Sequence, residues 1–172
     1  MDAFEIVSQF SRMLTNLDAW LQAGVDLAAS KGFPADVLAQ SRLAPDQYGL
    51  VQQVQSACDQ AKYAAAYLSG QAPPSHPDTE TTVEQLRERI RSAKAFVDGV
   101  KETAYASAET VRVAPPWMGG KSVRGDGYLM RIAIPNFYFH VTTAYAILRH
   151  NGVALGKGDY IGVKDFSELG AD

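Results

Sequence analysis

Apolar residues recur at helical spacing along the first part of the chain. Residues 2 to about 30 carry a stripe at Phe4, Val7, Phe10, Leu14, Leu17 and Leu21. Spacings of three and four residues place such side chains on one face of a helix. Asp2 is expected to cap this helix. Residues 31–34 are expected to end it, because Gly32 suits a left-handed cap and Pro34 cannot continue a helix.

A second helix is predicted from Pro45 to Ser69, followed by Gly70 in a position that suits a left-handed cap. Its apolar stripe contains many alanines, so a neighbouring helix can approach closely on that side. Residues 71–77 contain three prolines, which exclude helix and favour a stiff, extended linker. This linker is long enough to cross a bundle of helices.

The third helix has the most regular pattern in the chain. Its apolar positions alternate at spacings of three and four residues, at Val83, Leu86, Ile90, Ala93, Val97, Val100 and Ala104. Such alternation is typical of a helix packed in a bundle. Thr81 and Glu84 fit a capping box at its start.

The pattern then changes to short alternating segments. Residues 110–113 and 121–124 are predicted to form a two-stranded hairpin, in which Gly119 and Gly120 supply positive φ angles. An isolated hairpin is only marginally stable in water. We therefore expect it to lie across the end of the helical core, with Trp117 as its anchor.

Two interpretations compete for residues 128–134. A strand fits poorly because the alternation is interrupted, whereas a helix gives one continuous apolar stripe into the following segment. We therefore expect one helix from about Asp126, its N-cap, to His150. Pro135 lies inside this helix, and its missing N–H and its ring are expected to kink it there.

Composition narrows the class of protein. The 172 residues suit one domain, expected to span residues 1–172 with a tail from about residue 153. A net charge of −3 gives no electrostatic reason to expect a nucleic-acid partner. Cys58 is the single cysteine, which excludes an intramolecular disulfide, and its place on an apolar stripe predicts an inert, buried thiol.

No apolar run approaches the roughly 20 residues that span a bilayer. Acidic residues also occupy the N-terminus, where a signal peptide would carry positive charge. We therefore expect a cytoplasmic protein without a membrane partner.

His140 is the leading candidate for chemistry. It lies on the apolar stripe of the last predicted helix, one turn after Asn136. A histidine in such a position is either a core residue satisfied by hydrogen bonds or part of a site, and the sequence leaves both open. A zinc site needs at least three converging protein ligands, and the amide of Asn136 suits harder cations better than zinc.

The second predicted helix carries polar residues able to face inward. A carboxylate from Asp59 could orient the imidazole of His140. The alternative is a surface Asp59 paired with Lys62, three residues further on. The predicted ligand-binding site accordingly comprises His140, Asn136, Asp59, Gln55 and Tyr63.

The segment 135–153, PNFYFHVTTAYAILRHNGV, together with a helical core and an inserted hairpin, resembles the DinB/YfiT-like superfamily. More narrowly, it resembles a branch of that superfamily that is a domain of unknown function. The resemblance covers nearly the whole chain. It implies an all-α, four-helix bundle of up-down-down-up topology, with a small β-hairpin inserted before the last helix, and a homodimer.

Superfamily members with a metal site use one histidine from the second helix and an H-x-x-x-H pair from the last, and some are thiol-dependent transferases or isomerases. In this chain His140 matches the second histidine of the pair, and Asn136 stands where the first would be. No histidine occurs among Gln52, Gln53 and Gln55, where the second-helix ligand is expected. The resemblance therefore implies that the divalent metal site is largely lost.

Three functions remain open from the sequence. The first is a small-molecule binding protein, with a hydrogen-bonding pocket around His140 in place of the metal. The second is a divalent-metal-dependent hydrolase or a thiol transferase that uses His140 as ligand or general base. The third is a structural dimer module in which Asn136 and His140 form a buried polar pair. No cofactor other than a divalent metal is suggested.

Overall fold

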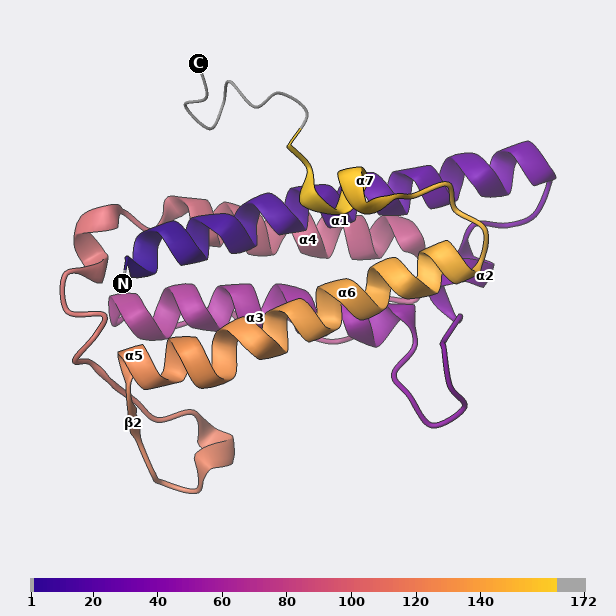
Figure 1. Ribbon diagram of the computed structural model, residues 1–172. Helices are drawn as coiled ribbons and strands as arrows, with labels where there is room; N and C mark the ends of the chain where they lie inside the picture. Colours follow the sequence, from indigo (N-terminus) through magenta and orange to yellow (C-terminus); the bar gives the residue numbers. More distant parts are fainter. Residues whose placement is uncertain (1, 164–172) are drawn as a thin grey trace, which may run out of the picture.

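The computed structural model of the protein describes residues 2–163, and its main elements are four long helices. These are α1 (Ala3–Lys31), α3 (Leu50–Ser69), α4 (Val83–Gly99) and α6 (Ile134–His150). Helices α1 and α6 run in one direction along the bundle, and α3 and α4 run in the other (Figure 1). The fold is therefore the expected up-down-down-up bundle, in which α3 packs on α4 and α6 while α1 packs on both of those helices.

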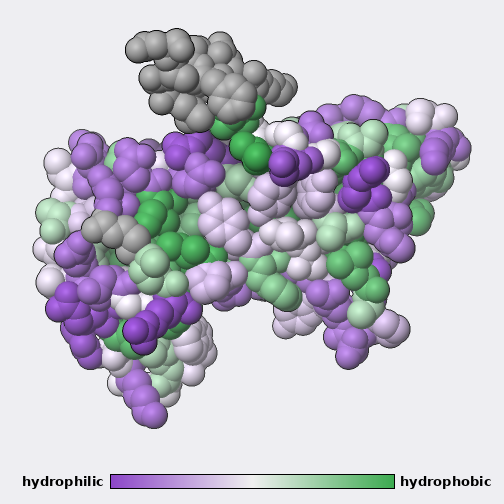
Figure 2. All heavy atoms as spheres, viewed as in Figure 1, coloured by the Kyte–Doolittle hydropathy of each residue, from purple (hydrophilic) through white to green (hydrophobic). Residues whose placement is uncertain are grey.

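The apolar stripes of the four helices meet in one core. Phe10 of α1 stacks on Phe137 of α6, with ring centroids 4.2 Å apart, and Val54 of α3 and Ile90 of α4 are buried in the same cluster. The outer surface is mostly hydrophilic, with separate hydrophobic patches between polar side chains (Figure 2). No helix in residues 2–163 is long and apolar enough to cross a membrane.

The start of α1 follows the sequence prediction. The Asp2 carboxylate accepts hydrogen bonds from the N–H groups of Phe4 and Glu5, at 2.9 and 3.2 Å. At the other end, Gly32 adopts a left-handed conformation with φ of 73°, which glycine tolerates because it has no Cβ.

The predicted start of α3 at Pro45 is wrong. A short helix α2 (Asp36–Ala39) comes first, and α3 begins only at Leu50, whose N–H donates to the carbonyl of Ser41. The cap is Gly49, whose N–H donates to Oε1 of Gln52 at 3.1 Å. A side chain three residues into the helix therefore satisfies the backbone of the cap, and this arrangement fixes the first turn.

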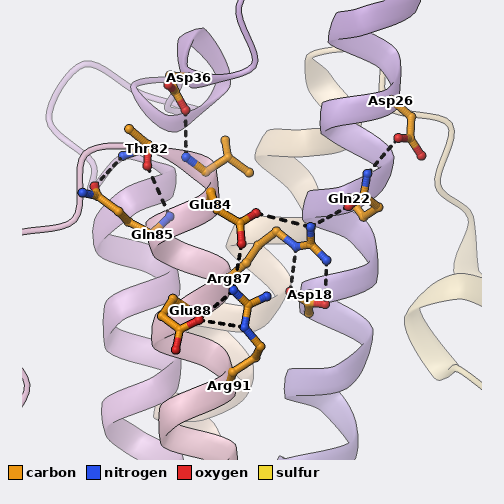
Figure 3. A network of polar contacts seen from close by, with 11 residues as sticks. Asp18, Gln22, Asp26, Asp36, Thr82, Glu84, Gln85, Arg87, Glu88 and Arg91 are labelled. Carbon is orange, nitrogen blue, oxygen red and sulfur yellow. Dashed lines mark hydrogen bonds and ion pairs between the residues drawn. The ribbon is translucent and has the colours of Figure 1, made fainter.

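Helix α4 is capped one residue later than predicted. Thr82, not Thr81, accepts the N–H of Gln85 through its hydroxyl, and the Gln85 side chain accepts the N–H of Thr82. The N–H of Val83 donates to the carboxylate of Asp36, which ties α2 to this helix end (Figure 3). The capping box is thus present but uses Gln85 in place of the predicted glutamate.

The same helix is also shorter than its apolar pattern suggests. It ends at Gly99, and a 3₁₀ turn, η1 (Glu102–Tyr105), follows. On its flank, Arg87 donates to the carboxylate of Asp18 on α1 at 2.9 and 3.2 Å (Figure 3). This bidentate pair joins two neighbouring helices across their polar edge.

The predicted hairpin is present but very short. Strands β1 (Arg112–Val113) and β2 (Val123–Arg124) pair antiparallel, and a 3₁₀ turn, η2 (Pro116–Met118), lies between them. The hairpin projects from one end of the bundle (Figure 1). Trp117 is 68% exposed, so the prediction that it anchors the hairpin is wrong, and the buried Val113 has this role.

The final long helix is continuous from residue 125 to residue 150, as predicted, but has three parts. The first two are α5 (Gly125–Tyr128) and a π-helical segment, η3 (Leu129–Ala133), and α6 completes it. Within η3 the N–H of Ile134 donates to the carbonyl of Leu129, five residues back. The wider turn accommodates the ring and the missing N–H of Pro135, and this is the form that the expected irregularity takes.

Asp126 was predicted to cap this helix, and that prediction is wrong. Arg124 occupies the cap position, and the Asp126 carboxylate pairs with its guanidinium at 3.0 Å and accepts the N–H of Gly127. After Gly152 the chain turns back and ends in α7 (Lys157–Ile161). There Tyr160 stacks on Trp20 of α1 with ring centroids 5.5 Å apart, so the described part of the tail packs on the bundle.

Candidate functional site

The predicted site centres on a contact between two helices. His140 of α6 faces Gln53 of α3, and its Nδ1 lies 2.8 Å from Gln53 Oε1. Gln53 is fully buried, whereas His140 is half-buried at the edge of the core. The histidine therefore joins α3 and α6 on one side and reaches the surface on the other.

The backbone fixes which atoms of this pair meet. The Nε2 of Gln53 donates to the carbonyl of Tyr48 at 3.1 Å. Because that carbonyl only accepts, the amide must direct its nitrogen to Tyr48 and its oxygen to the imidazole. His140 must then carry its proton on Nδ1, which leaves the lone pair on Nε2.

The Nε2 atom of His140 is available to a ligand. It has no hydrogen-bond partner among residues 2–163, and burial lowers the pKa of the imidazole below its usual value of 6.5. A neutral imidazole at pH 7 is a hydrogen-bond acceptor and a base. The ring of Phe139, itself 53% exposed, lies edge-on at 5.2 Å and gives the site an apolar wall.

Asn136 lies one turn before His140 on the same edge of α6, where residues four apart are neighbours. Its side-chain amide makes no hydrogen bond to any residue that the structure describes, and it is partly exposed. The π-helical segment that precedes Pro135 sets the register at which Asn136 and His140 leave the helix. Such segments are frequent at functional sites.

The structure divides the five predicted site residues between two places. Gln55 and Asp59 face α4 and the linker, not His140, so the predicted Asp59–His140 pair is wrong. The reason is helical geometry: residues two apart point about 200° away from each other, so Gln53 and Gln55 lie on opposite faces of α3. The alternative partner for Asp59 is correct, since its carboxylate lies 2.8 Å from Nζ of Lys62.

The second place is a buried charged cluster built on Arg89 of α4, whose side chain is 1% exposed. Its guanidinium lies 2.8 Å from Asp59, 3.0 Å from Glu80 and 3.2 Å from Asp78, and also donates to the carbonyl of Pro77. Burial lowers the pKa of Arg89, but its hydrogen bond to Asp59 and the neighbouring charges outweigh this and raise it overall. The segment just before α4, which carries Asp78 and Glu80, is thus fixed to Arg89 by ion pairs, and the end of the linker is held through the carbonyl of Pro77.

Gln55 belongs to this cluster as well. Its Nε2 donates to Glu80 at 2.8 Å. Burial acts to raise the pKa of Glu80, while the hydrogen bonds from Gln55, from the backbone and from Arg89 lower it, and the net effect is a lowered pKa. Glu80 is therefore held as a carboxylate, which matches its structural contacts.

His76 and Ser92 form a pair that resembles a nucleophile and its base. His76 Nε2 lies 2.8 Å from Ser92 Oγ, and His76 Nδ1 lies 3.3 Å from Nζ of Lys62. The Lys62 ammonium has only protons to offer, so Nδ1 accepts and Nε2 carries the hydrogen. The imidazole then donates to Ser92 and cannot remove its proton, which argues against a serine nucleophile here.

Two further side chains of α3, those of Cys58 and Tyr63, have raised pKa values, which disfavours their reactive anionic forms. Cys58 is fully buried, as predicted, and burial raises the pKa of its thiol to about 12. Tyr63 stacks on Tyr67 with ring centroids 5.6 Å apart, and burial together with the charge of Asp59 raises its pKa. Tyr63 therefore borders the charged cluster, away from Gln53 and His140.

The donors around His140 do not fit a zinc-type metal. One imidazole and the amides of Gln53 and Asn136 are the polar groups here, and the Gln53 oxygen already accepts the Nδ1 proton. Borderline metals bind imidazole and thiolate far better than amide oxygen. In residues 2–163 no group of three or more histidine, cysteine, aspartate or glutamate side chains could hold a metal ion.

Comparison with known proteins places this arrangement in a family. The profile of the family described as Domain of unknown function (DUF1993) matches residues 4–161. The chain belongs to this family. It is also similar to the crystal structure of a DinB family member protein from Shewanella denitrificans, with 48% sequence identity, a TM-score of 0.87, and coverage of 91% of this chain and 89% of that one. No curated protein matches significantly.

The DinB-like assignment based on segment 135–153 is therefore confirmed. The sequence did not single out Gln53, the partner of His140, or Arg89, the centre of the separate charged cluster. Gln53 was one of three glutamines considered, and only the packing of α3 on α6 selects it. Arg89 was overlooked although a signal existed. It lies three residues after Leu86 and four before Ala93, on the buried stripe itself.

Proposed function

We propose that this DinB-like protein binds a small molecule at the His140 site, where hydrogen-bonding groups stand in place of the superfamily's metal ligands. The observation that carries the proposal is the unpartnered Nε2 of a neutral imidazole whose other nitrogen is held by Gln53. A half-buried, pre-oriented acceptor of this kind favours a ligand with a hydrogen-bond donor.

The neighbouring side chains define the ligand further. The free amide of Asn136 can both donate and accept, and the exposed ring of Phe139 offers an apolar face. A small neutral molecule with a hydroxyl or N–H group beside an aromatic or aliphatic part is complementary to these three side chains.

A pair of matched compounds tests this. Phenol offers a hydroxyl proton to Nε2, whereas anisole has the same ring without it. We expect phenol, and not anisole, to shift the Cε1–H NMR signal of His140, and the effect to disappear in His140→Phe. His150→Phe is the control, because His150 lies exposed at the end of α6. Equal shifts with both compounds would contradict the proposal.

Metal analysis separates this function from a metal-dependent enzyme. Protein purified without a histidine tag should contain no stoichiometric zinc, nickel or manganese. A stoichiometric metal that is lost in His140→Ala would overturn the proposal in favour of a hydrolase or thiol transferase.

A further inference from the structure

The hairpin and the start of the last helix border an open hollow of about 720 Å³, whose lining includes three arginines. We call it the hairpin groove, and it comprises Arg112, Val123, Arg124, Asp126, Gly127, Met130, Arg131 and Ile132. It lies beside the hairpin that projects from one end of the bundle (Figure 1), and it shares no lining residue with the buried cluster around Arg89. Strongly hydrophilic residues surround hydrophobic surface at this end of the molecule (Figure 2).

Two of the arginines face each other across the hairpin. Arg112 and Arg124 are direct partners in the β1–β2 register, so their side chains leave the same face of the pair. Like charges in this position destabilise a hairpin unless something compensates them. Arg112 donates to the hydroxyl and carbonyl of Ser122, which carry no charge, whereas Arg124 pairs with the carboxylate of Asp126.

The third arginine is unpaired. Arg131 makes no hydrogen bond or ion pair with any residue between 2 and 163, and it is exposed on the helical side of the groove. Arginine is also the side chain best suited to bind phosphate oxygens in two parallel hydrogen bonds. The three guanidinium groups therefore approach one hollow from a strand, its partner strand and a helix.

The floor of the groove has room for a ligand. A Cβ added at Gly127 would meet no atom within 4 Å. Met130, which is 51% exposed, and the half-buried Val123 and Ile132 supply apolar surface beside the charges. The groove thus combines an open centre, three arginines and the carboxylate of Asp126 in its lining, and an apolar side, and the charge of Glu109 also acts on Arg124.

We propose that the hairpin groove binds a phosphate-type anion, held by Arg112, Arg124 and Arg131. Its charge is local, since the whole chain carries −3, so the attraction belongs to this surface and not to the protein at large. The proposal is independent of the His140 site, which recognises a neutral donor.

Pyrophosphate is the probe. We expect calorimetric titration of the full chain at low salt to detect binding that weakens as sodium chloride is raised. Arg131→Gln should weaken binding about fivefold, as for the loss of one partly exposed ion pair, and Arg131→Glu should abolish it. Lys31→Glu, at the opposite end of the bundle, makes the same change in net charge and should leave binding unchanged.

A second variant fills the groove without touching any arginine. Gly127→Leu places a side chain in the open centre and improves helix propensity, so the fold should persist. We expect it to lose pyrophosphate binding, as Arg131→Glu does. Binding that survives both variants, or that Lys31→Glu reduces equally, would overturn the proposal.

A lipid headgroup could supply the same phosphate chemistry, and cosedimentation distinguishes the two sources. Vesicles of phosphatidylglycerol, compared with phosphatidylcholine, would retain the protein in an Arg131-dependent and pyrophosphate-sensitive manner if the headgroup is the ligand. Binding of pyrophosphate without retention by vesicles identifies a soluble phosphate. Absence of both pyrophosphate binding and vesicle retention rules the site out.

Discussion

His140 and Gln53 are joined by a hydrogen bond whose direction is decided by a third group, the carbonyl of Tyr48. Since Gln53 Nε2 donates to that carbonyl at 3.1 Å, its oxygen must accept the Nδ1 proton of His140 at 2.8 Å. Tyr48 lies in the turn just before α3. The loop that precedes α3 therefore sets the protonated nitrogen of a histidine on α6.

This relationship predicts the tautomer of His140. In the wild type, ¹⁵N NMR at pH 8 should show the Nδ1–H form, against the Nε2–H form that free histidine prefers. Gln53→Leu removes the acceptor, and the preference should be lost. Gln55→Leu is the matched control, because Gln55 is a buried glutamine on the opposite face of the same helix, bonded to Glu80. A change in tautomer in the control would contradict the assignment.

If the amides of Gln53 and Asn136 stand where superfamily members have metal ligands, replacing both residues by histidine should rebuild the metal site. The variant Gln53→His with Asn136→His supplies three imidazoles together with His140, and we expect it to bind stoichiometric zinc. Either single substitution should bind much more weakly. Gln55→His with Asn136→His is the control, since residue 55 points toward Glu80. Equal zinc binding by the two double variants would show that residue 53 has no special place.

The buried guanidinium of Arg89 predicts a large difference between two arginines of one helix. Arg89→Ala removes the guanidinium that pairs with Asp59 and Glu80, and loss of one member of a buried ion pair costs about 3–5 kcal/mol. Lys62 remains beside Asp59, and Gln55 remains beside Glu80. Arg91, two residues on, pairs with glutamates at the surface, and Arg91→Ala should change stability little. Urea denaturation measures the free energy of unfolding of both variants. Similar effects for the two variants would contradict this.

The contact between His76 and Lys62 predicts that stability depends on pH. Burial, followed by the charges of Lys62 and Arg89, lowers the pKa of His76 in the folded protein, against the opposing charges of Asp59 and Glu80. The unfolded chain, in which histidine has its ordinary pKa of about 6.5, then binds the proton more readily. The free energy of unfolding should therefore fall as pH drops below about 6.5.

Thermal denaturation between pH 7.5 and 5 checks this. His76→Gln cannot titrate, so part of the decline should disappear. The remaining part belongs to His140, because burial lowers its pKa as well. Glu80 contributes only at lower pH, because its pKa is lowered from 4.5. His150→Gln serves as the control. A decline of unchanged size in His76→Gln would refute the assigned role.

Much of the fold could be predicted from the chain alone because its signals are local. Helical periodicity gave the stripes through Phe10, Leu86 and Phe137, and each of these residues is buried in the common core. The prolines of residues 71–77 excluded a tight turn, and α3 and α4 accordingly run in the same direction (Figure 1). Helix ends were less predictable at α3 and α4, because capping depended on Gln52 and Gln85.

The candidate site was only half predictable, for a physical reason. The sequence determined that His140 and Asn136 share one edge of a helix, since residues four apart lie together on any α-helix. Only the tertiary structure decided which face of α3 meets that edge, and therefore that Gln53, not Asp59, is the partner of His140. Likewise, burial of Arg89 depends on the carboxylate of Glu80, which precedes α4, and on that of Asp59, which packing brings from α3. Periodicity fixes the faces of a helix, but only packing selects the neighbour for each face.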